Sequence, residues 1–171
     1  MEKSKFNYLE KGIGQIAFVV PNLERAVEVY WNQFGIGPWQ FFTYQAPLLK
    51  KMSYHGKRAD FAFRIALASI GELRIELIEL IRGNTIYAEF VEKHGYGVHH
   101  LGMFVDDIEK AIANAKNHGI EMIMDGEGWG VDGDGHFAYL DTEDLIGITL
   151  EFIQRPKQKG EPEKVYPSVN S

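Results

Sequence analysis

The sequence contains no cysteine among its 171 residues, which excludes disulfide bonds, thiol catalysis and cysteine-ligated zinc. Basic residues are few and scattered: the 18 lysines and arginines are outnumbered by 24 aspartates and glutamates, for a formal net charge of −6. Because nucleic-acid binding needs a basic face, we expect no nucleic-acid partner. No apolar run approaches the length of a membrane span, and the first residues lead into no apolar signal segment. These absences predict a cytoplasmic protein with no membrane partner.

A short pattern occurs twice in the chain. Its first copy runs over residues 12–26 and its second over 97–111, at an offset of 85 (97 − 12). In both copies, glycine precedes an apolar run, and Leu-Glu-Arg-Ala in the first corresponds to Ile-Glu-Lys-Ala in the second. A second repeat relates residues 73–78 to 148–153, at an offset of 75 (151 − 76). The length suits one domain built from two similar modules with a sizeable core.

Apolar periodicity predicts the order β-α-β-β-β in each half. Asn22 and Asp107 occupy matched positions where each can cap the helix that follows the first strand of its half. Thr85 can cap a short helix over 86–94 that links the halves. We therefore predict an α+β fold in which two tandem βαβββ modules form a curved mixed sheet. The sheet would enclose a cleft and carry its helices outside.

Four parts follow from this pattern. They are an N-terminal extension (1–11), a first βαβββ module (12–82), a linking helix with the second module (83–154), and a C-terminal tail (155–171). The tail is polar, contains three prolines and lacks periodicity, so we expect it to be disordered. Residues 45–59 are expected to form a loop. The glycine-rich segment 125–135 is interpreted either as a mobile lid, with Trp129 over the cleft, or as a plain turn.

Each half places two polar side chains in otherwise apolar strands. Gln15 and His100 occupy matched positions of the first repeat, and Glu76 and Glu151 occupy matched positions of the second. A carboxylate between large apolar residues is costly unless it is paired or coordinated. One imidazole, one amide oxygen and two carboxylates suit a divalent ion such as Zn²⁺, Ni²⁺, Co²⁺, Mn²⁺ or Mg²⁺, and do not choose among them. A six-coordinate ion held this way would keep two positions for substrate oxygens.

These residues also have structural interpretations. Gln15 could simply be hydrogen-bonded within the sheet, and Glu76 could pair with Arg74 or Arg64. Glu151 could be solvated, and one histidine of the doublet His99-His100 must be structural. The metal interpretation is favoured because all four residues fall at matched positions of a repeat.

Three further segments have both a functional and a structural interpretation. Residues Tyr54, His55, Lys57 and Arg58 could contact an anionic substrate or form a solvated loop. The aromatic strand with Trp39, Phe41, Phe42 and Tyr44 could line a pocket or belong to the core. Residues 132–136 (DGDGH) suggest a calcium loop, but Phe137 stands where an EF-hand needs glycine, which argues against that site.

The combined motifs resemble the vicinal oxygen chelate superfamily, which includes glyoxalase I, methylmalonyl-CoA epimerase, extradiol dioxygenases and bleomycin-resistance proteins. The resemblance covers about residues 12–153. The segments that carry it are 14–20 (GQIAFVV), 75–79 (IELIE), 97–102 (GVHHLG) and 147–152 (GITLEF).

The family places one metal ligand on the first and last strand of each module. This implies a ligand set of Gln15, Glu76, His100 and Glu151. That set resembles one branch of glyoxalase I, whereas epimerase-like members more often have histidine at the first position. The segments 37–39 (GPW) and 95–100 (GYGVHH) nevertheless resemble the epimerase-like, glyoxalase-related branch.

The resemblance implies a lyase or isomerase that removes a proton from carbon next to a carbonyl chelated by the metal ion. Glu151 is then the first choice of base, with Glu76 as its partner. Epimerase-like members use a further glutamate near the third strand, and the stretch 56–64 offers none. A homodimer and a small carbonyl-containing substrate are also implied. The alternatives are a protein that sequesters a small molecule such as a drug without turnover and, as a weaker one, a non-haem iron dioxygenase.

Overall fold

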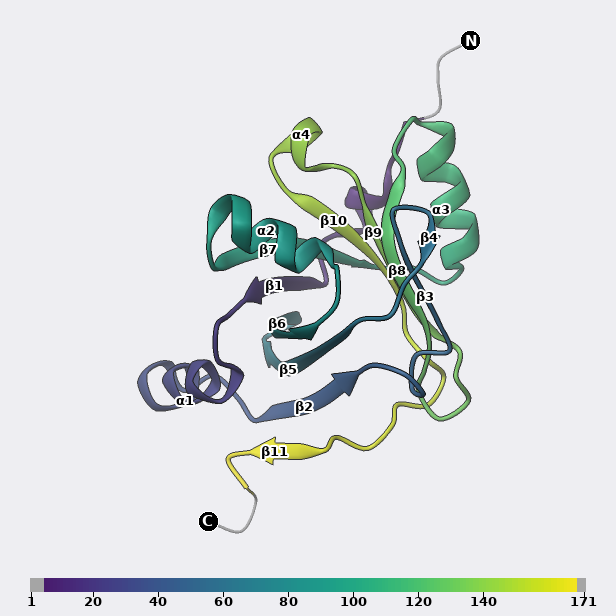
Figure 1. Ribbon diagram of the computed structural model, residues 1–171. Coiled ribbons are helices and arrows are strands. Elements are labelled where there is room, and N and C mark those ends of the chain that lie inside the picture. The colour runs from purple at the N-terminus through teal and green to yellow at the C-terminus, as the bar shows by residue number, and fades with distance from the viewer. Residues whose placement is uncertain (1–4, 169–171) are drawn as a thin grey trace.

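Two similar units make up the structure, a computed structural model that describes residues 5–168 (Figure 1). The first unit consists of β1 (Gln15–Val19), α1 (Leu23–Phe34), β2 (Trp39–Tyr44), β5 (Ala62–Ile70) and β6 (Leu73–Arg82). The second consists of β7 (Gly97–Phe104), α3 (Ile108–Asn117), β8 (Met122–Trp129), β9 (Gly135–Leu140) and β10 (Thr149–Gln154). Both units have the predicted order β-α-β-β-β, and the predicted α+β fold is confirmed.

Shorter elements connect and extend these units. They are the 3₁₀ helix η1 (Tyr8–Lys11), the hairpin β3 (Lys51–Tyr54) and β4 (Lys57–Arg58), the linking helix α2 (Ile86–His94), α4 (Glu143–Ile146), and β11 (Lys164–Tyr166). The helix predicted between the two halves is thus present, and the Thr85 hydroxyl oxygen caps it by accepting from the backbone N–H of Ala88 at 3.2 Å.

All strands belong to one curled sheet, in the order β11-β2-β5-β6-β1-β7-β10-β9-β8-β3-β4. The units meet at its middle, where β1 and β7 pair antiparallel. Each of these strands also pairs in parallel with the last strand of its own unit, β1 with β6 and β7 with β10. The central strands are therefore related by a pseudo-twofold axis that runs between β1 and β7.

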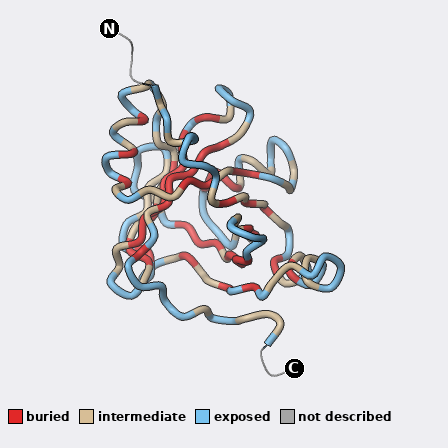
Figure 2. Tube along the Cα trace, turned by 180° about the vertical axis from the view of Figure 1, so that it is seen from behind, coloured by how far each residue is buried: buried red, intermediate tan, exposed pale blue. Residues whose placement is uncertain are grey.

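Helices α1 and α3 begin at the predicted caps and cover the outer side of the sheet. The side-chain oxygens of Asn22 and Asp107 accept from backbone N–H groups three residues on, at 2.8 and 3.0 Å. Under α1 lies a buried cluster that includes Leu23, Val27, Trp39 and Leu77, and under α3 lies one that includes Ile108, Ala111, Leu150 and Phe152. A third cluster, with Tyr44, Phe63, Tyr87 and Tyr139, fills the concave side. Buried residues accordingly follow the strands, as Figure 2 shows.

Two expected loops contain strands. Residues 45–59 include the hairpin β3–β4, which crosses to the second unit because β3 pairs with β8. The segment 125–135 begins as the second half of β8, which runs to Trp129. Neither strand shows clear apolar alternation: β3 is polar and partly exposed, and the glycines of β8 allow the close approach of other side chains. At Gly126, a Cβ would lie 2.5 Å from the Phe137 ring.

The expected disorder of the tail 155–171 is wrong for its described part, which ends at residue 168. Strand β11 pairs antiparallel with β2 and covers the edge of the first unit. The Glu163 carboxylate accepts from the Thr43 backbone N–H at 3.0 Å and from the Thr43 hydroxyl at 2.9 Å. These bonds use backbone groups and one side chain, so apolar periodicity could not reveal them. Residues 169–171 lie outside the described part.

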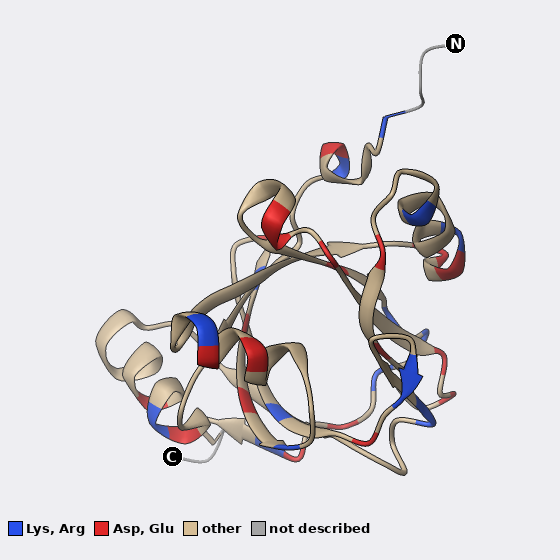
Figure 3. Ribbon diagram, turned by 45° about the horizontal axis from the view of Figure 1, so that its top comes forward, with Lys and Arg blue, Asp and Glu red and all other residues tan. Residues whose placement is uncertain are grey.

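Charged residues lie on many separate elements, and in Figure 3 the lysines and arginines do not gather on one face. Over residues 5–168, no helix is long and apolar enough to cross a membrane.

Candidate metal centre

The four predicted ligands lie on the concave side of the sheet, in two rows that cross its central strands. The first row joins paired positions on β6, β1, β7 and β10, namely Arg74, Gln15, Gly102 and Glu151. The second row, two residues along the strands, contains Glu76, Ala17 and His100. Side chains two residues apart on a strand share a face. The duplicated strands therefore bring four distant residues together at the pseudo-twofold axis.

Small residues keep this centre open. A Cβ on Gly102 would lie 2.9 Å from the Cβ of Gln15 and 3.2 Å from Oε2 of Glu151. Such contacts are too close for a side chain to fit without moving the residues of the centre. Glycine at this position therefore makes room for the convergence.

Three of the residues present ligand atoms to one point. The His100 Nε2 atom lies 3.0 Å from Oε2 of Glu151 and 3.4 Å from Oε2 of Glu76, and Glu76, His100 and Glu151 form a group that could hold a metal ion. Two ligands at right angles, each about 2.1 Å from an ion, are roughly 3 Å apart. One imidazole nitrogen and two carboxylate oxygens at these separations therefore fit a divalent ion.

The ionisable groups of the centre are buried, and burial and neighbouring charges shift the pKa values of His100 and Glu151. Glu76, His100 and Glu151 are 7%, 0% and 3% exposed. Burial raises the pKa of Glu151 against the lowering effect of His100. Burial lowers the pKa of His100, but the charges of Glu151 and Glu76 and their hydrogen bonds outweigh it and raise that pKa to about 9. Burial thus disfavours the charged form of Glu151, as expected for a buried carboxylate that a cation would neutralise.

Gln15 also reaches the centre, but through its nitrogen. Its Nε2 donates to Oε2 of Glu76 and to Oε2 of Glu151, both at 3.0 Å. Its Oε1 accepts from Nε of Arg74 at 2.6 Å. An amide nitrogen is not a metal ligand, so Gln15 could coordinate an ion only after its amide turned over and gave up the Arg74 bond. The predicted metal ligation by Gln15 stays a prediction.

A β-bulge places both histidines of the doublet on the same side. In a regular strand they would point to opposite faces. The pairing of β1 with β7 shifts register here, because Ala17 pairs with His100 and Phe18 with Val98, which leaves His99 as the extra residue. The two Nδ1 atoms lie 2.8 Å apart. No signal in the sequence indicates this bulge, so sequence reasoning missed the contact between the two side chains.

His99 fixes the orientation of His100. For His100 Nε2 to bind a metal ion, its Nδ1 must carry the proton, and that proton can be donated to Nδ1 of His99. Burial lowers the pKa of His99 well below its ordinary value, with a further contribution from His100, so its ring is neutral and can accept. The rings of Tyr87 and Phe90 contact His99, with centroids 5.2 and 4.9 Å away. Such outer partners orient metal ligands.

The centre opens into a cavity of about 540 Å³. Its walls include six aromatic side chains, those of Phe42, Tyr44, Phe63, Trp129, Phe137 and Tyr139. Trp129 ends β8, is 9% exposed against the ring of Tyr44 and lines the cavity; a lid role for its segment stays a prediction. An apolar pocket with a few convergent polar groups is the usual form of a small-molecule site.

The aromatic side chains of strand β2 have two different roles: some belong to the core and others line the cavity. Trp39 and Phe41 belong to the buried cluster under α1, whereas Phe42 and Tyr44 line the cavity. Strand alternation explains the division, since successive side chains point to opposite faces.

The charged hairpin lies away from the cavity. Tyr54 and His55 hydrogen-bond to Glu89 on α2, and Lys57 and Arg58 are exposed on β4. Another group, Asp125, Glu127 and His136, is close enough to hold an ion. Its members already have protein partners: His136 bonds Asp125 at 2.8 Å, and Lys51 bonds Glu127 at 3.0 Å. These residues are satisfied without an ion.

Residues 14–139 match the model of the glyoxalase/bleomycin resistance protein/dioxygenase superfamily. The chain belongs to this superfamily. No curated protein matches the sequence significantly. The superfamily membership agrees with the resemblance found in the sequence. In this chain, the fold places the four predicted ligands at the axis between the two units.

Similar solved structures share this fold. Methylmalonyl-CoA epimerase from Mycobacterium tuberculosis is 18% identical over 85% of this chain and 89% of its own, with a TM-score of 0.63. A Streptomyces coelicolor methylmalonyl-CoA epimerase in complex with 2-nitronate-propionyl-CoA is 21% identical over 86% and 96%, with a TM-score of 0.63. A hypothetical protein from Bacillus halodurans is 25% identical over 87% and 97%, with a TM-score of 0.58.

Proposed function

We propose that the protein is a metal-dependent lyase or isomerase that removes a proton from carbon next to a carbonyl group. One observation carries the proposal: Glu76, His100 and Glu151 converge in a buried group at the end of an apolar cavity. A divalent ion held there would supply positive charge opposite the negative charge that develops on the carbonyl oxygen. The substrate class is a small molecule that carries such a carbonyl.

Glu151 is the proposed base. Its pKa is raised by burial, and a carboxylate with a raised pKa takes up a proton more readily than an exposed one. Glu76 lies across the pseudo-twofold axis and is the proposed partner. Return of the proton to the other side of the same carbon would be epimerisation, and return to the neighbouring carbon would be isomerisation of the glyoxalase kind. Both outcomes stay open.

The stretch 56–64 does not supply the further acid of epimerase-like members. It contains no glutamate, and its one carboxylate, Asp60, is exposed and pairs with Arg82 at 2.9 Å. This departure disfavours methylmalonyl-CoA epimerase as the specific activity, although the solved structures that share the fold include such epimerases.

A protein that sequesters a small molecule without turnover is the second candidate, because the aromatic walls could hold an apolar molecule without chemistry. Binding that is equally tight before and after treatment with a chelator would favour it. A non-haem iron dioxygenase is weaker still, since that chemistry favours two histidines and one carboxylate. Here His99 lies behind His100 and leaves one histidine at the centre. The homodimer and the cytoplasmic location remain predictions.

Exchange of substrate hydrogen with solvent tests the proposal. The protein is incubated in D₂O with a panel of 2-oxo acids, hemithioacetals and acyl-CoA esters, and NMR follows deuterium uptake beside the carbonyl. We expect uptake that a chelator abolishes and an added divalent ion restores. Glu151→Gln should lower the rate by about 100-fold or more. Glu127→Gln, the same change at a carboxylate that bonds Lys51 on the surface, should have no effect. Undiminished exchange in metal-loaded Glu151→Gln would remove Glu151 from the mechanism.

A further inference from the structure

Two arginines lie over one aromatic ring near the cavity, and a lysine lies close to both of them. The guanidinium carbons of Arg74 and Arg155 lie 4.8 and 4.2 Å from the centroid of the Phe104 ring. The ammonium group of Lys159 lies close enough to both arginines for their charges to act on it. Like charges are destabilising at this proximity unless something compensates them.

None of these three cations forms an ion pair with a carboxylate of the described residues. Partial burial of the Lys159 ammonium lowers its pKa, and the charges of Arg74 and Arg155 lower it further. Other arginines of the protein differ: Arg64 binds Glu24 and Arg82 binds Asp60. An ion bound by Glu76 and Glu151 would balance those two carboxylates and so offset the charge of Glu151 that Arg74 otherwise feels.

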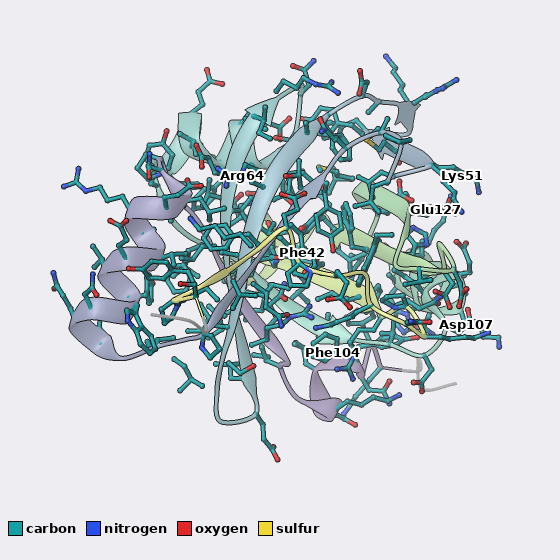
Figure 4. All side chains as sticks on the ribbon, turned by 90° about the horizontal axis from the view of Figure 1, so that it is seen from below. Phe42, Lys51, Arg64, Phe104, Asp107 and Glu127 are labelled. Atoms are coloured by element: carbon teal, nitrogen blue, oxygen red, sulfur yellow. The ribbon has the colours of Figure 1, made fainter. Side chains whose placement is uncertain are left out.

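This cluster faces the cavity that contains the candidate metal centre. Arg74 and Lys159 both line it, and Arg74 also holds Oε1 of Gln15. The C-terminal segment brings Lys159 there, and in Figure 4 that segment crosses between the labelled Phe42 and Phe104. Its path is held by the second unit, since Val131 N–H donates to Gln158 O at 3.0 Å.

A buried donor beside the same segment also lacks a partner. The indole nitrogen of Trp129 has no hydrogen-bond acceptor within the described residues, although Trp129 is 9% exposed and lines the cavity. An unsatisfied buried N–H is destabilising, so a site that retains one is expected to meet an acceptor from a ligand.

Two acidic residues share the rim, and neither neutralises the cluster. The Glu163 carboxylate already accepts two hydrogen bonds from Thr43. Glu161 is exposed and forms no ion pair with Lys159 within the described residues.

We propose that Arg74, Lys159 and the Trp129 indole N–H form an anion subsite, with Arg155 adding charge behind Phe104. The subsite takes a carboxylate or phosphate group of an organic acid whose apolar part lies along the aromatic walls. This inference rests on the proposed function in one respect only, that the bound acid is the substrate of the neighbouring centre. It names the substrate class as an anionic carbonyl compound.

Titration with phenylphosphate tests the subsite, with phenol as its uncharged match. The readout is the indole N–H signal of Trp129 in an NMR spectrum of the ¹⁵N-labelled full-length protein as purified. We expect a saturable shift with phenylphosphate and affinity for phenol at least about tenfold weaker, since a charge-assisted hydrogen bond is worth about 1.5–3 kcal/mol. Equal binding of phenol, or no saturable shift with phenylphosphate, would overturn the proposal.

A matched pair of lysines supplies the control. Lys159→Gln should weaken phenylphosphate binding about fivefold to tenfold, and Lys159→Arg should retain it. Lys157→Gln removes a charge from the same exposed segment but from outside the cavity, so it should change binding less than about twofold. Equal losses in Lys159→Gln and Lys157→Gln would show general charge attraction and contradict a defined subsite.

Repeating the titration after a chelator separates the two proposals. If the protein binds phenylphosphate but has no affinity for a metal ion, the anion subsite is supported and the proposed metal-dependent function is wrong. Metal-dependent exchange in a protein that does not distinguish phenylphosphate from phenol would have the opposite meaning.

Discussion

The two halves of the candidate metal centre are built on corresponding strands of the two units but supported differently. In the first unit, Gln15 is held by Arg74, a charged residue that lines the cavity. In the second unit, His100 is held by His99, a neutral ring packed between aromatic side chains. The repeat therefore sets where the four side chains meet, whereas residues outside the ligand positions decide which atom each one presents.

The second half should therefore supply the stronger hold on a metal ion. His100→Ala removes the imidazole nitrogen that Glu76 and Glu151 surround, and we expect metal affinity to fall by more than about 100-fold in a calorimetric titration. His94→Ala, a change at a partly exposed histidine that pairs with Glu143, is the control and should bind normally. Normal metal affinity in His100→Ala would break the comparison.

His99→Ala should have the next largest effect. Loss of an outer partner typically costs 10–100-fold in metal affinity, and we expect a decrease of about that size because His100 loses the group that fixes its ring. His99→Gln, which retains an acceptor, should recover part of the affinity. Equal affinities of the wild type and His99→Ala would show that the bulge has no role in orienting His100.

Gln15→Ala tests the first half and should have a smaller effect. Because the amide oxygen binds Arg74 and not the centre, we expect metal affinity to change by less than about tenfold. A loss as large as that of His100→Ala would mean that the amide turns over on metal binding. Gln15 would then be a ligand, as the sequence analysis predicts.

Truncation after Pro156 should have the smallest effect on the centre. It removes β11 and the Glu163 contacts with Thr43 but none of the four predicted ligands. We expect metal affinity within about twofold and a melting temperature lowered by a few degrees, since about 1 kcal/mol shifts it by roughly 2–4 °C in a protein of this size. A large loss of metal affinity would show that the tail belongs to the centre.

Sequence patterns predicted the fold well where the strands are amphipathic. Alternation in 13–20 and 98–105 placed Gln15 and His100 on the inner face, and the caps Asn22 and Asp107 marked both outer helices. The hairpin β3–β4 and strand β11 were missed because they add to sheet edges through backbone hydrogen bonds, which polar sequences also form.

The detailed contacts of the candidate site could not be predicted from the sequence. Matched positions of the repeat indicated which four side chains would meet. The bulge at His99 and the bond between Arg74 and Gln15 depend on tertiary contacts of single residues, which no periodicity reports. The basic cluster around Phe104 likewise joins β6, β7 and the tail, whose proximity only the folded chain reveals.

The proposed function requires that the carboxylates of Glu76 and Glu151 and the imidazole of His100 bind a single divalent ion between the two units. Its most direct test is the metal content of the purified protein, measured by elemental analysis after equilibration with a divalent ion and removal of the excess. The account predicts about one ion per chain in the wild type and in His94→Ala, and almost none in the double variant Glu76→Gln/His100→Ala. A wild type that retains no ion, or a double variant that retains as much as the wild type, would contradict it.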